Sequence, residues 1–202
     1  MSRDPVVFVV DDDPSLRTAV GRLIQSVGLP ARTFESAEAF LANVDQSMPG
    51  CLVLDVRMHG ASGIELQHKL TSSGYTLPVI FVSAHADVDL TVRVMRMGAL
   101  QVFSKPFDDQ ALLDAIHEAI EIDRKQRTAA HDVAELQARY ETLTAREREV
   151  MQLVVTGMLN KQIAAELGTT EKTVKVHRAQ VVRKMQADSV ASLVRMADRL
   201  PG

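Results

Sequence analysis

Carboxylates, one serine and one lysine stand at the ends of short apolar runs in the first half of the chain. They are Asp11, Asp12 and Asp13 after the first run, Asp55 and Ser83 at the ends of two later runs, and Lys105 after the last. Carboxylates that crowd together repel one another unless a cation joins them, and Mg²⁺ prefers oxygen ligands. A carboxylate can also attack phosphorus, a reaction that depends on positioning and charge neutralisation. If the fold gathers these residues, they predict magnesium-assisted phosphoryl transfer to a carboxylate.

The elements that must position these residues are predicted from an alternation of short β-branched runs with longer amphipathic stretches. This alternation is typical of a doubly wound parallel sheet, an α/β fold of five βα units. The predicted strands are residues 6–10, 31–34, 51–55, 79–83 and 101–104, and the predicted helices are residues 15–27, 37–45, 63–72, 89–97 and 109–122. Ligands of such sheets bind beyond the carboxyl ends of the strands. We therefore expect one crevice to gather the polar residues, with Asp13 as a helix N-terminal residue.

Composition narrows the classes of protein. The 202 residues allow two compact domains or one large one. The single cysteine, Cys51, lies inside an apolar run and is expected to be a buried hydrophobic residue. No apolar stretch approaches the roughly 20 residues that span a bilayer, and the first residues lack the pattern of a signal peptide. These features predict a cytoplasmic protein with no membrane partner.

Charge is distributed unevenly along the chain. Residues 1–120 carry 9 Lys and Arg against 15 Asp and Glu, whereas residues 143–202 carry 10 against 6. An acidic first part suits a bound cation, and a basic last part suits a polyanion. Ordinary variation of surface charge is the alternative explanation.

Residues 121–142 contain neither Gly nor Pro and predict a linker helix. Heptad spacing relates one set of residues here: Ile122, Gln126, Ala129, Val133, Leu136, Tyr140 and Leu143. Two interpretations stay open. The helix forms a parallel coiled coil in a dimer, or it rests on one of its own domains.

The last part, residues 143–202, is predicted to be entirely helical. Thr144 and Glu147 form a capping-box pattern that starts a helix, which should end near Gly157. Three more helices are expected at 160–167, 171–185 and 189–200. The second and third helices, joined by a short turn with a glycine, have the outline of a helix-turn-helix. Basic residues gather on the third helix: Lys172, Lys175, Arg178, Arg183 and Lys184.

Taken together, the segments VVDDDPS, LVLDVRM, VSAHAD and VFSKPF resemble the receiver domain of two-component response regulators. The resemblance implies a flavodoxin-like receiver domain over residues 1–120. It also implies roles for the polar residues: Asp55 as phosphoacceptor, Ser83 and Lys105 as contacts of the phosphoryl group, and Asp11, Asp12, Asp55 and the Arg57 backbone carbonyl as ligands of Mg²⁺. The peptide between Lys105 and Pro106 is then expected to be cis.

Three positions bear on how closely this receiver pattern is followed. Val102 stands where receivers commonly carry an aromatic residue that switches its rotamer, and Phe103 is expected to face the opposite side of its strand. His59 replaces a proline often found after the methionine, a change expected to alter loop stiffness rather than chemistry. His85 is either a residue that tunes the lifetime of the phosphoryl group or a solvated loop histidine.

The segments LTAREREV, NKQIAAELG and TEKTVKVHRAQVVRKM resemble the LuxR/NarL-type DNA-binding domain, so residues 143–202 are expected to form its four helices. With the receiver, this is the arrangement of FixJ/NarL regulators. The resemblance implies two groups of DNA contacts: Lys175, Val176 and Ala179 at the bases, and Asn160, Lys161, Lys172, Thr173, His177 and Arg178 towards the backbone. A protein-binding helix pair with a solvated basic face is the alternative. The last helix is either a dimerisation helix or part of the core.

The resemblance predicts that a cognate sensor histidine kinase phosphorylates Asp55, and that the chain then forms a homodimer, binds promoter DNA and regulates transcription. RNA polymerase is a further candidate partner. The chain is not expected to be an enzyme beyond its own phosphotransfer and slow autodephosphorylation. A phosphatase of the haloacid-dehalogenase type is disfavoured, because Arg57 stands where such enzymes usually carry a second Asp. The intact Asp11, Asp12, Asp55 and Lys105 set opposes a pseudo-receiver.

Overall fold

The computed structural model describes residues 4–45, 47–84 and 86–200. It divides into two compact units, Met1–Arg127 and Thr128–Gly202, which are described separately below. Within the described residues, no helix combines the length and the apolar character that crossing a membrane requires.

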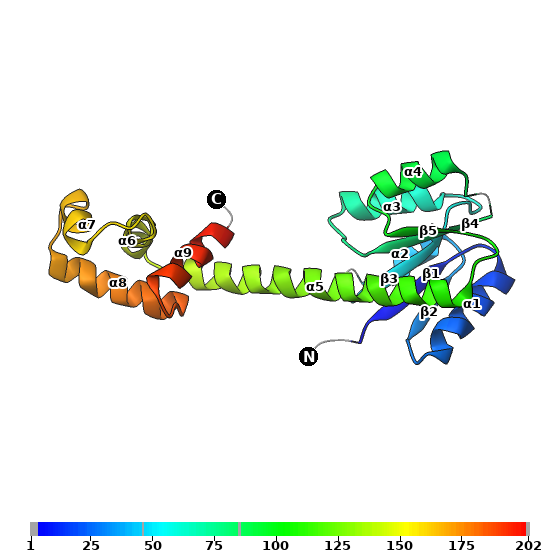
Figure 1. The fold of residues 1–202 in the computed structure, drawn as a ribbon, viewed down its shortest axis with the longest axis horizontal. Coiled ribbons are helices and arrows are strands. Elements are labelled where there is room, and N and C mark those ends of the chain that lie inside the picture. Colours follow the sequence, from blue (N-terminus) through cyan, green and yellow to red (C-terminus); the bar gives the residue numbers. More distant parts are fainter. Residues whose placement is uncertain (1–3, 46, 85, 201–202) are drawn as a thin grey trace. The chain divides into compact units, whose positions relative to one another are not determined.

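The first unit is built on a five-stranded parallel sheet with the strand order β2-β1-β3-β4-β5 (Figure 1). Its strands are β1 (Val6–Val10), β2 (Ala31–Phe34), β3 (Gly50–Asp55), β4 (Val79–Ser83) and β5 (Gln101–Ser104). Every residue of β1, β3 and β4 is buried. This matches their continuous apolar sequences, because central strands of a parallel sheet are covered on both faces. The predicted α/β fold and strand positions are confirmed.

Helices cover both faces of this sheet. They are α1 (Pro14–Ser26), α2 (Ala37–Asn43), α3 (Gly63–Ser72), α4 (Val88–Arg96) and the first part of α5 (Asp109–Glu141). One core contains residues of α1 and α5, such as Ile24 and Ile116, and the other contains residues of α2, α3 and α4, such as Phe40, Leu66 and Val94. The doubly wound arrangement therefore leaves the carboxyl edge of the sheet free of covering helices, as a ligand site there requires.

Helix α5 runs unbroken from Asp109 to Glu141, past the predicted domain boundary at residue 120. The buried carboxylate of Asp123 accepts hydrogen bonds from Gly50 N at 2.9 Å and from Arg127 Nε. Arg127 also donates to the main-chain carbonyls of Ser47 and Met48. These contacts fasten α5 to the amino end of β3 and account for the extent of the first unit, which ends at Arg127.

The second unit is helical, with α6 (Ala145–Val155), α7 (Asn160–Glu166), α8 (Glu171–Met185) and α9 (Val190–Arg199) following the end of α5. Its core takes residues from each of these helices, among them Val150, Ile163, Val181 and Leu193. The predicted all-α architecture is confirmed. Leu193 of α9 is part of this core, so packing within the unit accounts for at least part of the apolar face of α9.

The heptad residues of the linker fall into different environments. Leu136 and Leu143 are buried in the core of the second unit, and Tyr140 packs against it. Ala129 is exposed and Val133 is half-buried. The last heptad therefore packs within its own unit, as the second interpretation of the linker expects.

Candidate functional site

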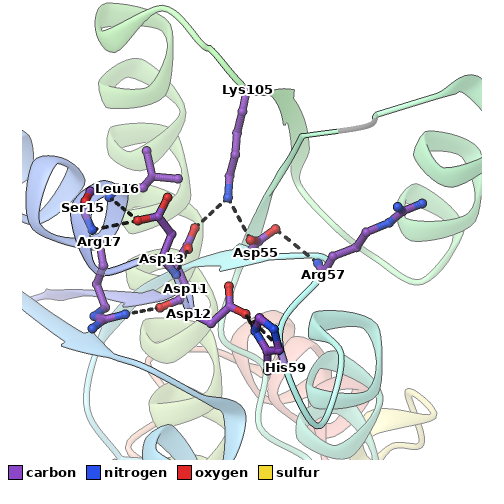
Figure 2. A network of polar contacts seen from close by, with 10 residues as sticks. All are labelled: Asp11, Asp12, Asp13, Ser15, Leu16, Arg17, Asp55, Arg57, His59 and Lys105. Atoms are coloured by element: carbon purple, nitrogen blue, oxygen red, sulfur yellow. Dashed lines mark hydrogen bonds and ion pairs between the residues drawn. The ribbon is translucent and has the colours of Figure 1, made fainter.

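Three carboxylates meet at the carboxyl edge of the sheet. Asp11 and Asp12 follow β1, Asp55 ends β3, and one oxygen from each lies within 4.8 Å of the others. Figure 2 shows the three side chains converging from two neighbouring strands. Because β1 and β3 pair in parallel, their ends lie side by side even though the residues are more than 40 positions apart.

Lys105 neutralises part of this charge. Its Nζ lies 2.8 Å from Asp11 Oδ2 and 2.8 Å from Asp55 Oδ2, so the lysine bridges two strands (Figure 2). Burial raises the pKa of Asp55, although the hydrogen bond from Lys105 opposes this rise. Burial acts to lower the pKa of Lys105, but its contacts with Asp11 and Asp55 outweigh that effect and raise it. The expected cis peptide between Lys105 and Pro106 is present.

Residues that follow β1 donate hydrogen bonds to Asp11. The Asp13 main-chain N–H donates to Asp11 Oδ1 at 2.9 Å, and Arg17 donates to the Asp11 carbonyl. Asp13 itself caps α1 by accepting from the main-chain N–H groups of Ser15 and Leu16. The expectation that Asp13 serves the start of the helix is therefore confirmed.

Asp12 is held by His59, from the loop after β3. The His59 main-chain N–H donates to Asp12 Oδ2 at 2.9 Å, and His59 Nδ1 contacts the same oxygen (Figure 2). Burial acts to raise the pKa of Asp12, but these hydrogen bonds from His59 outweigh it and hold the pKa below its ordinary value of 3.8. Both the main chain and the ring of His59 contact a predicted metal ligand, while the expectation that this residue alters loop stiffness rather than chemistry stays a prediction.

The other predicted receiver residues border the same crevice. The Arg57 main-chain N–H donates to Asp55 Oδ1 at 3.2 Å. Ser83 is fully buried at the end of β4, and its carbonyl accepts from Lys105 N at 2.8 Å. The loop after β3 returns so close to that strand at Gly63 that a side chain there would not fit, because a Cβ would stand 2.1 Å from the Asp55 carbonyl oxygen. His85 lies outside the described residues.

Val102 and Phe103, neighbours on β5, pack on opposite sides of the sheet. Val102 packs against the core that contains α2, α3 and α4, whereas Phe103 packs against the opposite core. The ring of Phe103 meets Phe107, with centroids 6.3 Å apart. The expectation that Phe103 faces the other side of β5 is therefore confirmed, and it does not replace the aromatic on the Val102 side.

These residues fit a small divalent cation. They offer three carboxylates within reach of one another, and oxygen ligands are those that Mg²⁺ takes. The ammonium group of Lys105 donates hydrogen bonds to Asp11 and Asp55, whereas Asp12 accepts a hydrogen bond from His59. Asp11, Asp12 and Asp55 are accordingly the residues that could hold the ion.

In the second unit, α7 and α8 form the helix-turn-helix. The side chain of Thr170 caps α8 by accepting from Thr173 N, and Gly168 turns the chain with a φ of +61°. Arg178 Nη1 donates to Asn160 Oδ1 at 2.9 Å, which ties α8 to the start of α7. Two of the predicted backbone-contacting residues are thus joined in one contact.

One side of α8 is buried and the other is open. Val174, Val181 and Met185 are fully buried, whereas Lys175, Val176 and Ala179 are exposed. Val176 is 55% exposed, so its apolar side chain is accessible to a ligand of α8. Lys161 and Lys172 are also exposed, while Thr173, His177 and Arg178 are half-buried. The predicted base-reading residues therefore share an accessible face.

Sequence reasoning missed two parts of this arrangement. The Asp123 and Arg127 contacts were not foreseen, although an Asp and an Arg four residues apart on a helix are a recognisable pair. The Lys184 contact with Glu147, at 2.6 Å, also joins α8 to the capping box of α6. The sequence does not show which loop Arg127 contacts or which helix Lys184 contacts, because both partners are distant along the chain.

Comparisons with known proteins agree with this geometry. Residues 7–117 match the family described as response regulator receiver domain, and residues 141–197 match the family of bacterial regulatory proteins of the luxR type. The chain is 48% identical to Nodulation protein W of Bradyrhizobium diazoefficiens over 199 residues, covering 98% of this chain and 88% of that protein. It is 39% identical to Transcriptional regulatory protein FixJ of the same organism, covering 96% and 94%. Among solved structures, response regulator StyR is 44% identical with a TM-score of 0.90, covering 98% of this chain and all of that one.

Proposed function

The chain belongs to the two-component response regulators that join a receiver domain to a LuxR-type DNA-binding domain and regulate transcription, and from this premise we propose that a cognate histidine kinase phosphorylates Asp55. The observation that carries the proposal is the position of the Asp55 carboxylate. It lies at the open edge of the sheet, beside two further carboxylates and 2.8 Å from the ammonium group of Lys105.

Each residue of the crevice has its own proposed role in phosphoryl transfer. Asp55 supplies the attacking oxygen, and the Arg57 main-chain N–H at 3.2 Å and Lys105 orient its carboxylate. Lys105 is also placed to pair with a phosphoryl oxygen, as Ser83 at the end of β4 is expected to do. Asp11, Asp12, Asp55 and the Arg57 carbonyl would hold Mg²⁺, which would supply neutralisation of the charge on the phosphoryl oxygens.

The phosphorylated chain is proposed to dimerise and to bind promoter DNA. The exposed face of α8 supports the second step, with Lys175, Val176 and Ala179 at the bases and basic residues near the phosphates. A dimer would present two such helices to two half-sites. Contact with RNA polymerase would follow from promoter binding.

The relative FixJ is named a transcriptional regulatory protein, and we propose that the chemistry of the crevice acts on the chain itself. Asp55 would take up the phosphoryl group and release it slowly, with no other substrate. Arg57 stands two residues after Asp55, where a phosphatase of the haloacid-dehalogenase type usually carries a second Asp.

The test compares the full chain with Asp55→Asn, in the presence of Mg²⁺ and acetyl phosphate. Sedimentation measures dimerisation and fluorescence anisotropy measures binding to a promoter fragment. We expect the donor to raise both in the wild type and neither in Asp55→Asn. The matched control is Asp13→Asn, which keeps a helix cap and should respond as the wild type does. Equal DNA binding with and without the donor would show that Asp55 is not the control.

A further inference from the structure

His59 contributes two contacts to the crevice, and a proline at its position could make neither of them. Its main-chain N–H donates to Asp12 Oδ2 at 2.9 Å, and its Nδ1 contacts the same oxygen. Proline has no main-chain N–H and no polar side chain. The residue that departs from the receiver pattern is therefore the one that holds Asp12.

The three carboxylates differ in how they are held. Asp11 receives the Asp13 N–H and Lys105, and Asp55 receives the Arg57 N–H and Lys105. Among the residues that the structure describes, both side-chain hydrogen bonds to Asp12 come from His59. The Asp12 side chain is also the most accessible of the three, with 23% exposed against 2% for Asp11 and 8% for Asp55. Its orientation therefore depends on His59 more than on burial.

Both contacts use a single oxygen of Asp12. Figure 2 shows the other carboxylate oxygen turned away from His59, on the side where Asp55 lies. A carboxylate fixed in this way presents a free oxygen to the crevice at a lower cost in side-chain entropy than one that must be ordered by the ion. Partners behind a ligand commonly orient it for its metal.

We propose that His59 is a positioning residue, which holds Asp12 so that its free oxygen can ligate the divalent cation of the crevice. The inference deepens the proposed function, since it rests on the magnesium site assigned to Asp11, Asp12 and Asp55. The main-chain N–H and the ring act together, so each should account for part of the affinity for the ion.

The test is isothermal titration calorimetry of the full, unphosphorylated chain with MgCl₂. His59→Ala keeps the main-chain N–H and removes the ring, and His59→Pro removes both donors. His59→Asn keeps the N–H and offers a side-chain amide donor in place of the ring. Removal of such an orienting partner typically costs 10 to 100-fold in metal affinity. Because the His59 side chain is 99% exposed, we expect a loss of affinity below this range, about three to tenfold for His59→Ala.

The order of the Mg²⁺ dissociation constants distinguishes positioning from a general loss of structure. We expect His59→Pro to bind more weakly than His59→Ala, and His59→Asn to recover most of the wild-type affinity. The matched control is His68→Ala, an exposed histidine on α3, which should bind as the wild type does. Urea denaturation in the absence of Mg²⁺ should differ little between His59→Ala and the wild type.

Two kinds of failure can be told apart. If the wild type binds Mg²⁺ and Asp12→Asn does not, but His59→Ala and His59→Pro bind with wild-type affinity or more tightly, His59 does not position Asp12. If the wild type itself does not bind Mg²⁺, the magnesium site of the proposed function is overturned, and this inference with it.

Discussion

Lys105 is the residue on which the charge balance of the crevice depends, because its Nζ lies 2.8 Å from oxygens of both Asp11 and Asp55. One ammonium group faces three carboxylates, so the crevice keeps an excess of negative charge. Such an excess attracts a cation. It also makes the folded state less stable when Asp55 is ionised.

Replacement of Asp55 by Asn should therefore stabilise the unphosphorylated chain at pH 7 without Mg²⁺, by about 1 kcal/mol for one repulsion removed. Burial raises the pKa of Asp55, so the ionised carboxylate opposes folding above that pKa. The opposition fades as the pH falls through the raised pKa and is absent below the ordinary value of 3.8. The stabilising effect should fade over the same range, as measured by urea denaturation at several pH values.

The control for this prediction is Asp114→Asn, on the exposed face of α5, where no such gain is expected. A destabilised Asp55→Asn at pH 7 would show that the contact with Lys105 outweighs repulsion and burial.

Among the elements, α5 is attached to the sheet by the buried Asp123 and the partly exposed Arg127, which pair with each other and with main-chain groups. Asp123 receives Gly50 N as well as Arg127, and Gly50 is required there because a Cβ would stand 1.8 Å from the Val6 carbonyl oxygen. The attachment lies at the amino end of β3, at the opposite end of that strand from Asp55. The first unit ends at Arg127, the second residue of this ion pair.

Asp123→Ala should destabilise the first unit by about 3 kcal/mol, because it leaves the Gly50 N–H and the Arg127 guanidinium without their acceptor. Hydrogen exchange of residues 120–127 should accelerate together with that of β3. The matched control is Glu121→Ala, which removes an exposed ion pair with Arg124 on the same helix and should leave the stability close to that of the wild type. Equal effects of the two variants would contradict the assigned role of Asp123.

The start of α6 and the end of α8 are joined by Glu147 and Lys184. Burial acts to raise the pKa of Glu147, but Lys184 and Thr144 outweigh it and lower the pKa below its ordinary value of 4.5. A lowered pKa contributes stability above pH 4.5 that is lost as the pH falls through the folded-state value. The second unit should therefore lose stability on acidification through this pair.

Glu147→Gln should cost about 1 to 3 kcal/mol at pH 7, since the ammonium group of Lys184, whose side chain is only 23% exposed, loses its counter-charge. The difference from the wild type should shrink below pH 4.5, as followed by hydrogen exchange in α6 and α8. Glu149→Gln, in an exposed pair with Arg146, should stay within about 0.5 kcal/mol of the wild type. A difference for Glu147→Gln that is constant with pH would contradict a charge effect.

In the molecule as a whole, the acidic and basic parts of the sequence correspond to two units with different proposed ligands. The first gathers carboxylates for a cation, and the second exposes basic residues on α8. Lys172 and Lys175 are both exposed but have different proposed roles, one at phosphates and one at bases. Phosphate contacts depend on salt, whereas base contacts determine sequence preference.

Lys172→Ala should weaken binding to all DNA sequences alike and reduce the slope of log K against log salt by about 1. Lys175→Ala should cost about 1 to 3 kcal/mol on the preferred site and narrow its advantage over other sequences. Anisotropy titrations of the phosphorylated chain at several salt concentrations separate the two effects. Lys69→Ala, on α3 of the other unit, should alter neither quantity, and an unchanged salt slope in Lys172→Ala would remove that lysine from the interface.

The fold of each unit and the residues that line the crevice could be predicted from the amino-acid sequence alone. Strands such as 51–55 are continuous apolar runs, and the ends of parallel strands meet at one edge, so Asp11, Asp55 and Lys105 could be brought together without coordinates. The exposed face of α8 followed in the same way from helical spacing.

The contacts that depend on the path of a loop, in contrast, could be known only from the three-dimensional arrangement of the chain. His59 reaches Asp12 across 47 positions, and Arg127 reaches the Ser47 carbonyl across 80. Periodicity says which face of an element a residue occupies, but not which loop passes that face or which rotamer its side chain takes there. For that reason His59 could be recognised from the sequence as a departure, while its hold on Asp12 could be found only in the fold.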